Sequence, residues 1–110
     1  MEQVLLVLTN VPDEAAACAL ARRLVEQSVA ACVNILPKVR SVYRWQGALE
    51  EAEEVRLFIK TTQLRYLELE VAIKDAHPYL VPEIIAVPVM AGLPAYLKWV
   101  EEETGRESDA

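Results

Sequence analysis

The segment His77-Pro78-Tyr79-Leu80-Val81-Pro82-Glu83 combines residue types that can take part in chemistry. His77 is the only histidine of the chain, and a neutral imidazole is a good ligand for copper or zinc. Cys32 offers a thiol that would be a second soft donor if the fold, or another subunit, brought it close to His77. The alternative is structural: a histidine that caps a helix end and a cysteine packed in the core. These two residues are the candidate metal ligands, with Cu²⁺ or another divalent ion as the metal.

A second set of residues could hold a small anionic ligand. Lys60 ends a predicted strand and Glu83 begins the last one, so the two could face each other across an antiparallel sheet. Such residues form either an ion pair or part of a ligand site. Tyr43 and Trp45 could form an aromatic wall of the pocket, and packing at an interface is the alternative for both.

Other features limit the chemistry. Four carboxylates stand close together in the sequence: Glu50, Glu51, Glu53 and Glu54. Strand alternation would send them to opposite faces, so they would not converge on a cation. We expect them to pair with Arg40 and Arg44 across the hairpin. There is no Gly-rich phosphate loop and no nucleophile elbow. We therefore expect no enzymatic reaction and no required cofactor.

Composition narrows the class of protein. A chain of 110 residues is long enough for one domain, expected over residues 1–103 with a polar tail at 104–110. The net charge of −6 argues against nucleic acid or an anionic membrane as a partner, because phosphate binding needs a basic surface. No apolar stretch reaches the length of a membrane span, and Glu2 and Gln3 stand where a signal peptide would be basic. A cytoplasmic protein is expected.

The two cysteines lack the spacing of a metal finger. We expect reduced thiols, with Cys18 buried in the core. The chain has only two Asn and four Gln, and Arg outnumbers Lys. Depletion of thermolabile amides is typical of heat-adapted proteins, which indicates a thermostable protein.

Hydrophobic periodicity predicts the elements that position these residues. Residues 3–9 are nearly all apolar and predict a central strand, after which Asn10 and Pro12 favour the start of a helix. That helix would bury a stripe of small and apolar side chains: Ala17, Leu20, Ala21, Leu24, Val25 and Ser28. Further strands are expected over 30–36, 39–45, 50–61 and 84–90, and further helices before Pro78 and after Pro94.

This order, βαββαβ plus a terminal helix, predicts an α+β protein with the ferredoxin-like split βαβ arrangement. Its four-stranded antiparallel sheet has the second and fourth strands at the edges. Pro37 and Pro88 fall in those two strands, which supports the assignment because proline cannot donate to an interior ladder.

The hairpin of residues 38–61 is long for its domain. The run from Glu50 to Thr61 would extend over about 40 Å, whereas a compact domain of this size is about 34 Å across. Part of the extended β-hairpin should overhang and find a partner in another copy of the chain, so we expect a homo-oligomer. The alternative is a coiled hairpin that folds back on its own sheet.

Short motifs occur in a set order along nearly the whole chain: Thr9 with Pro12-Asp13-Glu14-Ala15, Ala30-Ala31-Cys32-Val33-Asn34, Ser41-Val42-Tyr43-Arg44-Trp45-Gln46-Gly47, Lys60-Thr61-Thr62, His77-Pro78-Tyr79 with Val81-Pro82-Glu83, and Tyr96-Leu97-Lys98-Trp99. Together they resemble the CutA family, known as divalent-cation tolerance proteins. The resemblance implies a ferredoxin-like subunit in a tight homotrimer, similar in architecture to the PII signalling proteins. It also implies a role in tolerance of copper and other divalent metals.

The chain departs from this family at three positions. Thr9 stands where some members have a cysteine, and Ala76 where some have a second histidine. Leu80 stands where an acidic residue is common. Of the copper-binding side chains found in some members, only His77 remains.

The resemblance makes a homotrimer that functions in divalent-metal tolerance our first hypothesis, with weak Cu²⁺ binding at His77 and Cys32. The second hypothesis is a PII-like sensor that binds a small anionic metabolite between subunits through Lys60, Glu83, Tyr43 and Trp45. A third is a structural trimer that anchors another protein.

Overall fold

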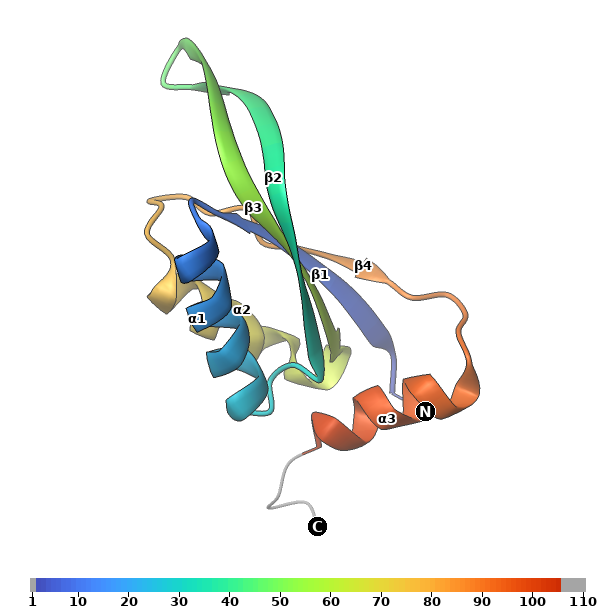
Figure 1. The fold of residues 1–110 in the computed structure, drawn as a ribbon. Coiled ribbons are helices and arrows are strands. Elements are labelled where there is room, and N and C mark those ends of the chain that lie inside the picture. The colour runs from blue at the N-terminus through green and yellow to red at the C-terminus, as the bar shows by residue number, and fades with distance from the viewer. Residues whose placement is uncertain (1, 106–110) are drawn as a thin grey trace.

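A computed structural model describes residues 2–105 (Figure 1). The elements, in chain order, are β1 (Val4–Val11), α1 (Glu14–Glu26), β2 (Cys32–Trp45), β3 (Ala48–Thr62), the 3₁₀ turn η1 (Gln63–Arg65), α2 (Tyr66–Ala76), β4 (Ile85–Pro88) and α3 (Pro94–Glu103). All neighbouring strands are antiparallel, in the order β2-β3-β1-β4. The predicted ferredoxin-like α+β fold is confirmed, and Pro37 and Pro88 lie in the two edge strands.

The start of α1 differs from the prediction. Asp13 caps the helix, because its Oδ1 accepts a hydrogen bond from the Ala16 N–H at 2.8 Å. Asn10 is not the cap, since β1 continues to Val11 and Asn10 still pairs with Arg56 of β3.

One side of α1 is buried, at the positions Ala17, Leu20, Ala21 and Leu24. Cys18 is exposed, which corrects its expected burial. A helix turns by about 100° per residue, so the neighbour of buried Ala17 points away from the core. Val25 is also exposed, one position beyond the end of the buried stripe.

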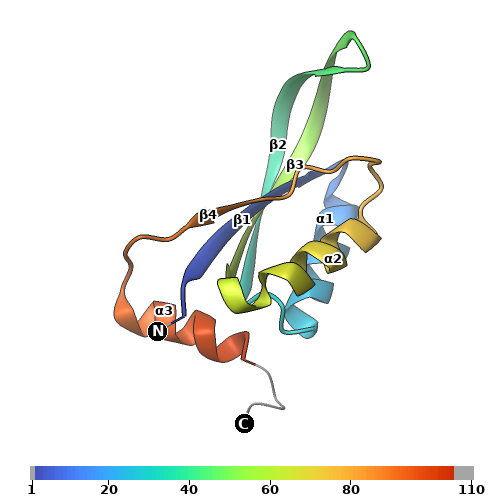
Figure 2. The same cartoon turned by 180° about the vertical axis from the view of Figure 1, so that it is seen from behind.

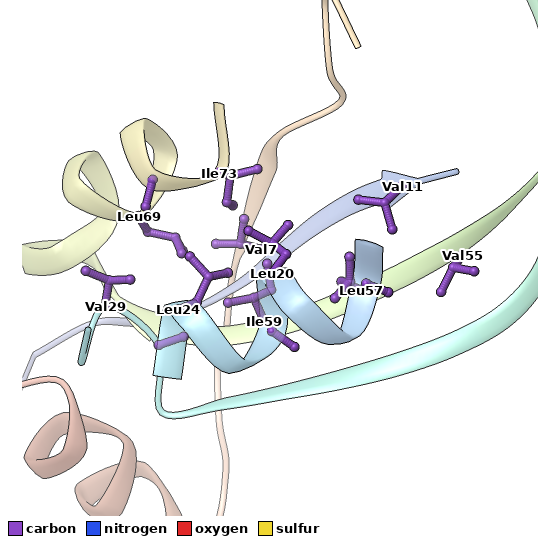
Figure 3. Close-up of a cluster of buried hydrophobic side chains, with 14 of the residues drawn as sticks. Val7, Val11, Leu20, Leu24, Val29, Val55, Leu57, Ile59, Leu69 and Ile73 are labelled. Carbon is purple, nitrogen blue, oxygen red and sulfur yellow. The ribbon is translucent and has the colours of Figure 1, made fainter. Parts of the chain in front are cut away.

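Helices α1 and α2 cover one face of the sheet (Figures 1 and 2), and the main core lies between them and the sheet. Figure 3 shows the side chains that meet there, from β1 and β3 on one side and from the two helices on the other. The fully buried members include Val7, Leu57, Ile59, Leu24, Leu69 and Ile73.

The opposite face of the sheet, called the open face below, is covered by α3 only near Val4, which packs with Val100. The strand register places a set of apolar side chains on this face: Leu6, Leu8, Leu36, Phe58, Ile85 and Val87. None of them is fully buried, and Ile85 and Val87 are 48% and 44% exposed. An apolar surface of this kind marks an interaction site.

Strands β2 and β3 continue beyond the end of β1, whose last pair is Val11 with Val55 (Figure 1). The overhanging hairpin, residues 39–54, makes the molecule elongated, with extents of 48 × 26 × 22 Å. This confirms the predicted overhang. A bulge between Leu36 and Val39, with Lys38 at a φ of 59°, sets off the hairpin from the rest of β2. Gln46 and Gly47 form the turn, both with positive φ, as a tight hairpin turn requires.

The residue that caps the end of α3 is a buried threonine. Thr104, the first residue of the predicted polar tail, is buried and donates a hydrogen bond from its hydroxyl to the Val100 carbonyl at 2.8 Å. The rest of the expected tail, 106–110, lies outside the described residues. Within residues 2–105, no helix has the length and apolar character needed to cross a membrane.

Two leucines of α2 test the position of the core. Leu69 is fully buried, whereas Leu67, on the same helix, is 72% exposed. Leu69→Ala should lower the free energy of unfolding by about 2–5 kcal/mol because it leaves a cavity. Leu67→Ala should change it by less than about 0.5 kcal/mol. Denaturant titrations at equal protein concentration measure both, and equal effects of the two changes would contradict the helix orientation.

Candidate functional site

A cavity of about 790 Å³ lies along the overhanging hairpin, between it and the segment of residues 77–84 that connects α2 to β4. Its walls come from the end of β1, from both strands of the hairpin and from the connecting segment: Asn10, Ser41, Val42, Tyr43, Trp45, Gln46, Glu54, Arg56, Tyr79, Leu80, Val81 and Glu83. Three residues of the predicted pocket, Tyr43, Trp45 and Glu83, therefore lie together.

The guanidinium in this cavity belongs to Arg56. Its Nη1 and Nη2 donate to Oε1 and Oε2 of Glu83, both at 3.2 Å, and Nη1 also donates to Oδ1 of Asn10 at 3.0 Å. The two parallel bonds form a bidentate ion pair. Arg56 thus joins β3 to both β1 and the connecting segment.

Lys60 does not line the cavity and does not pair with Glu83, contrary to the expected pair. It lies four residues beyond Arg56 on β3, a distance of about 13 Å along a strand. Its Nζ donates to Oδ1 of Asn34 on the neighbouring β2.

Glu54 is a buried carboxylate at the start of the overhang, with 7% of its surface exposed. Its Oε1 accepts from Nδ2 of Asn10 at 3.3 Å, and its Oε2 accepts from the hydroxyl of Tyr79 at 2.7 Å. Burial raises the pKa of Tyr79, and the hydrogen bond and charge of Glu54 raise it further, with smaller contributions from Tyr43 and Asp13. No lysine, arginine or histidine among residues 2–105 forms an ion pair with Glu54.

The expected pairing of the glutamates with arginines occurs at one position. Arg40 lies 3.4 Å from Glu51 across the hairpin, in an exposed ion pair. Arg44 donates instead to the carbonyl oxygen of Gly47 in the turn. Glu54 departs from the pattern because it lies where the hairpin meets the body of the sheet.

His77 is buried and uses both ring nitrogens within the chain. Its Nε2 lies 2.6 Å from the carbonyl oxygen of Asn10, and its Nδ1 accepts from the N–H of Tyr79 at 3.2 Å. A carbonyl can only accept, so Nε2 carries the proton of a neutral imidazole. The ring also packs on Tyr79, with centroids 4.7 Å apart. His77 therefore ties the connecting segment to the end of β1.

Cys32 lies at the other end of the sheet. It pairs with Lys60 in the strand register and adjoins Tyr96 of α3, whose pKa is raised by burial first and by the neighbouring thiol second. His77 contacts Asn10, which pairs with Arg56, whereas Cys32 pairs with Lys60, an offset of about 13 Å along the strands, and β3 lies between β1 and β2. One chain does not bring them together, and no cluster of three or more His, Cys, Asp or Glu residues in the described part is placed to hold a metal ion.

Sequence reasoning missed four of the polar residues in this region: Asn10, Glu54, Arg56 and Tyr79. Arg56 did carry a signal, since it is a charge within the alternating run Val55 to Lys60. Its partner could not be read from the sequence, because that depends on the path of the connecting segment. Tyr79 lay within the motif that was singled out for His77.

The fold defines a class of protein: a small ferredoxin-like domain with an overhanging hairpin and one sheet face left open. Residues 5–103 match the family model described as "CutA1 divalent ion tolerance protein". The chain belongs to this family, as its motifs indicated.

Relatives and solved structures agree with this assignment. The chain is 48% identical to the divalent-cation tolerance protein CutA of Thermus thermophilus over 96% of its own length and 100% of that relative. It is 46% identical to the protein CutA homolog of Xenopus laevis over 81% of its own length, and spans 59% of that relative. Its structure superposes on that of the Thermus thermophilus protein with a TM-score of 0.90, at 47% identity, covering 96% of this chain and 100% of the other. For CutA1 of Oryza sativa the TM-score is 0.92, at 38% identity, covering 96% of each chain.

The bond between Tyr79 and Glu54 predicts a loss of stability at high pH. The pKa of Tyr79 is raised above its ordinary value of 10.0 in the folded chain. Its contribution is therefore complete below about pH 10 and is lost as the pH rises from there toward the raised pKa, because the unfolded chain releases the proton first. Tyr79→Phe should make the unfolding midpoint less dependent on pH above 10.

Denaturant titrations between pH 8 and 11 measure this effect. Tyr43→Phe is the control, since Tyr43 contributes less than Glu54 to the raised pKa of Tyr79. It should leave most of the pH dependence in place. An unchanged pH dependence in Tyr79→Phe would show that the hydroxyl of Tyr79 is not protected by Glu54.

Proposed function

We propose that this protein is a homotrimer that contributes to the tolerance of divalent metals, copper in particular. Membership of the CutA1 divalent ion tolerance family supports the general role. The observation that supports assembly is the open face, whose apolar side chains include Phe58, Ile85 and Val87. Burying each such side chain contributes about 1.5–3 kcal/mol, so a second layer over this face is strongly favoured.

The sheet edges favour a closed ring. In the part of the chain that the structure describes, β2 and β4 each have one free edge, and no third strand lies beside the overhanging hairpin. Pairing between the β2 edge of one subunit and the β4 edge of the next would join two different surfaces, and such contacts form a ring when the rotation between subunits closes. In a ring of three, the open faces turn inward and cover one another, which is the assembly that the resemblance to PII-like trimers implies.

Copper is the metal that fits the candidate ligands, because imidazole and thiolate donors suit it. His77 would bind through Nδ1 after releasing the 3.2 Å hydrogen bond from Tyr79. Cys32 would join it only from another subunit, since the two lie at different ends of the sheet in one chain. Displacing an existing bond makes the expected affinity weak.

The cavity favours a second candidate function, that of a small-ligand sensor. Three of the four residues expected for such a site line it: Tyr43, Trp45 and Glu83. Its volume of about 790 Å³ lies in the range of 300–1,000 Å³ that is usual for small-molecule sites. Binding there would change the contacts between the hairpin and the connecting segment.

Light scattering tests the assembly. The expected mass is three times the 12.3 kDa of the chain. Val87→Glu places a charge on the open face and should lower the mass, whereas Leu67→Glu, on the solvent side of α2, should not. A monomer at micromolar concentration in the unchanged protein would overturn the proposal.

Calorimetric titration of chelator-treated protein with Cu²⁺ tests the metal. We expect weak, saturable binding of about one ion per subunit, because each chain supplies one histidine. Cys32→Ser should weaken it, and Cys18→Ser is the matched control because that thiol is exposed on α1. His77→Gln should abolish it, with circular dichroism used to confirm folding. Unchanged affinity in both Cys32→Ser and His77→Gln would rule out this ligand pair.

A further inference from the structure

The cavity beside the hairpin contains a carboxylate that forms no ion pair within residues 2–105. Glu54 is 7% exposed, and both of its oxygens accept hydrogen bonds from neutral groups, those of Asn10 and Tyr79. The guanidinium of Arg56 is close by along β3, but both of its Nη atoms already bind Glu83. Burying an ionised carboxylate is costly, and neutral donors offset that cost only in part. A cation entering the cavity would therefore gain from Glu54.

Aromatic side chains form the other part of the cavity. Tyr43 and Trp45 come from β2 and are 43% and 40% exposed, and Tyr79 comes from the connecting segment. The faces of aromatic rings attract cations, with tryptophan the strongest of the three types. The pKa of Tyr79 is raised in part by the charges of Glu54 and Asp13, which indicates a negative potential at this end of the cavity.

We propose that the cavity binds a small organic ammonium ion, with the ammonium group at Glu54 and the apolar part of the ligand against Tyr43 and Trp45. This inference rests on the small-ligand candidate above and names its ligand class. It replaces the expected anion with a cation, because Lys60 lies outside the cavity and Arg56 is already neutralised by Glu83. A bare divalent ion fits less well, since it needs several oxygen ligands and an ammonium group needs only one carboxylate.

Three probes of nearly equal size separate charge from shape: pentylammonium, 1-pentanol and pentanoate. The titrations use Trp99→Phe protein, in which Trp45 is the single tryptophan and its fluorescence reports on the cavity. Pentylammonium should give a saturable change, 1-pentanol should bind at least tenfold more weakly, and pentanoate should give no response at equal ionic strength.

Two variants test the roles of the cavity residues. Glu54→Gln keeps the shape and removes the charge, so pentylammonium should lose its advantage over 1-pentanol. Glu53→Gln is the matched control, because this carboxylate lies on the opposite face of the same strand, outside the cavity, and its loss should change nothing. Where Glu54→Gln does not fold, Tyr43→Leu removes an aromatic face and should weaken pentylammonium binding by about fivefold while sparing 1-pentanol.

The other outcomes overturn the proposal in different ways. Preferential binding of pentanoate would show that Arg56 is the recognition group and would leave the sensor candidate standing with an anionic ligand. No response to any probe would remove both the ligand class and the sensor candidate. A response seen only in Val87→Glu protein would show that a neighbouring subunit fills the cavity. The trimer and copper proposals are measured separately, by mass and by calorimetry.

Discussion

The rest of the structure depends on the ladder between β1 and β3, which runs without a break from Val4–Thr62 to Val11–Val55. Because side chains alternate along both strands, this register decides which residues enter the core and which face away from the helices. Val7 and Ile59 pair on the covered face, and Leu6 and Lys60 pair on the open face. A shift of one residue would exchange the two faces and expose the core.

The end of this ladder is where the polar network begins. The last pairs leave Asn10 and Arg56 on the open face, just before β3 continues alone with β2. Asn10 makes three hydrogen bonds there. Its backbone carbonyl oxygen accepts from His77 and its side-chain Oδ1 accepts from Arg56, while its Nδ2 donates to Glu54. One residue thus joins the end of β1, the base of the hairpin and the connecting segment, the three chain segments that line the cavity.

The alternation of residues in the sequence predicts which face of a strand a side chain lies on. It does not predict which residue of a neighbouring segment that side chain meets, because this depends on the strand register. Alternation from Val55 to Lys60 identified the two faces of β3, and Pro37 and Pro88 identified the edges. Arg56 and Lys60 have the same parity, however, so no pattern in the sequence could decide which one meets Glu83.

The same limit applies to His77 and Cys32, and to the cap of α1. Each candidate metal ligand was placed on its correct element, but their separation depends on the pairings Asn10–Arg56 and Cys32–Lys60, which only the structure supplies. Asn10 and Asp13 are both good capping residues, and the choice between them depended on how far β1 continues to pair with β3. That the hairpin overhangs was predictable from strand length, whereas the size of the overhang depends on where β1 stops pairing with β3.

Assembly and ligand binding would be coupled through the dielectric environment of Glu54. In a single chain, the cavity opens beside the open face, and water can screen a charge at its mouth. Covering the open face with other subunits, as proposed, would remove some of that water and strengthen every electrostatic interaction in the cavity. Arg56 and Glu83 would keep their mutual charge balance under that change, because they already neutralise each other. Glu54 is bonded, among the described residues, by the neutral groups of Asn10 and Tyr79, so its preference for a cation would grow as the proposed trimer forms.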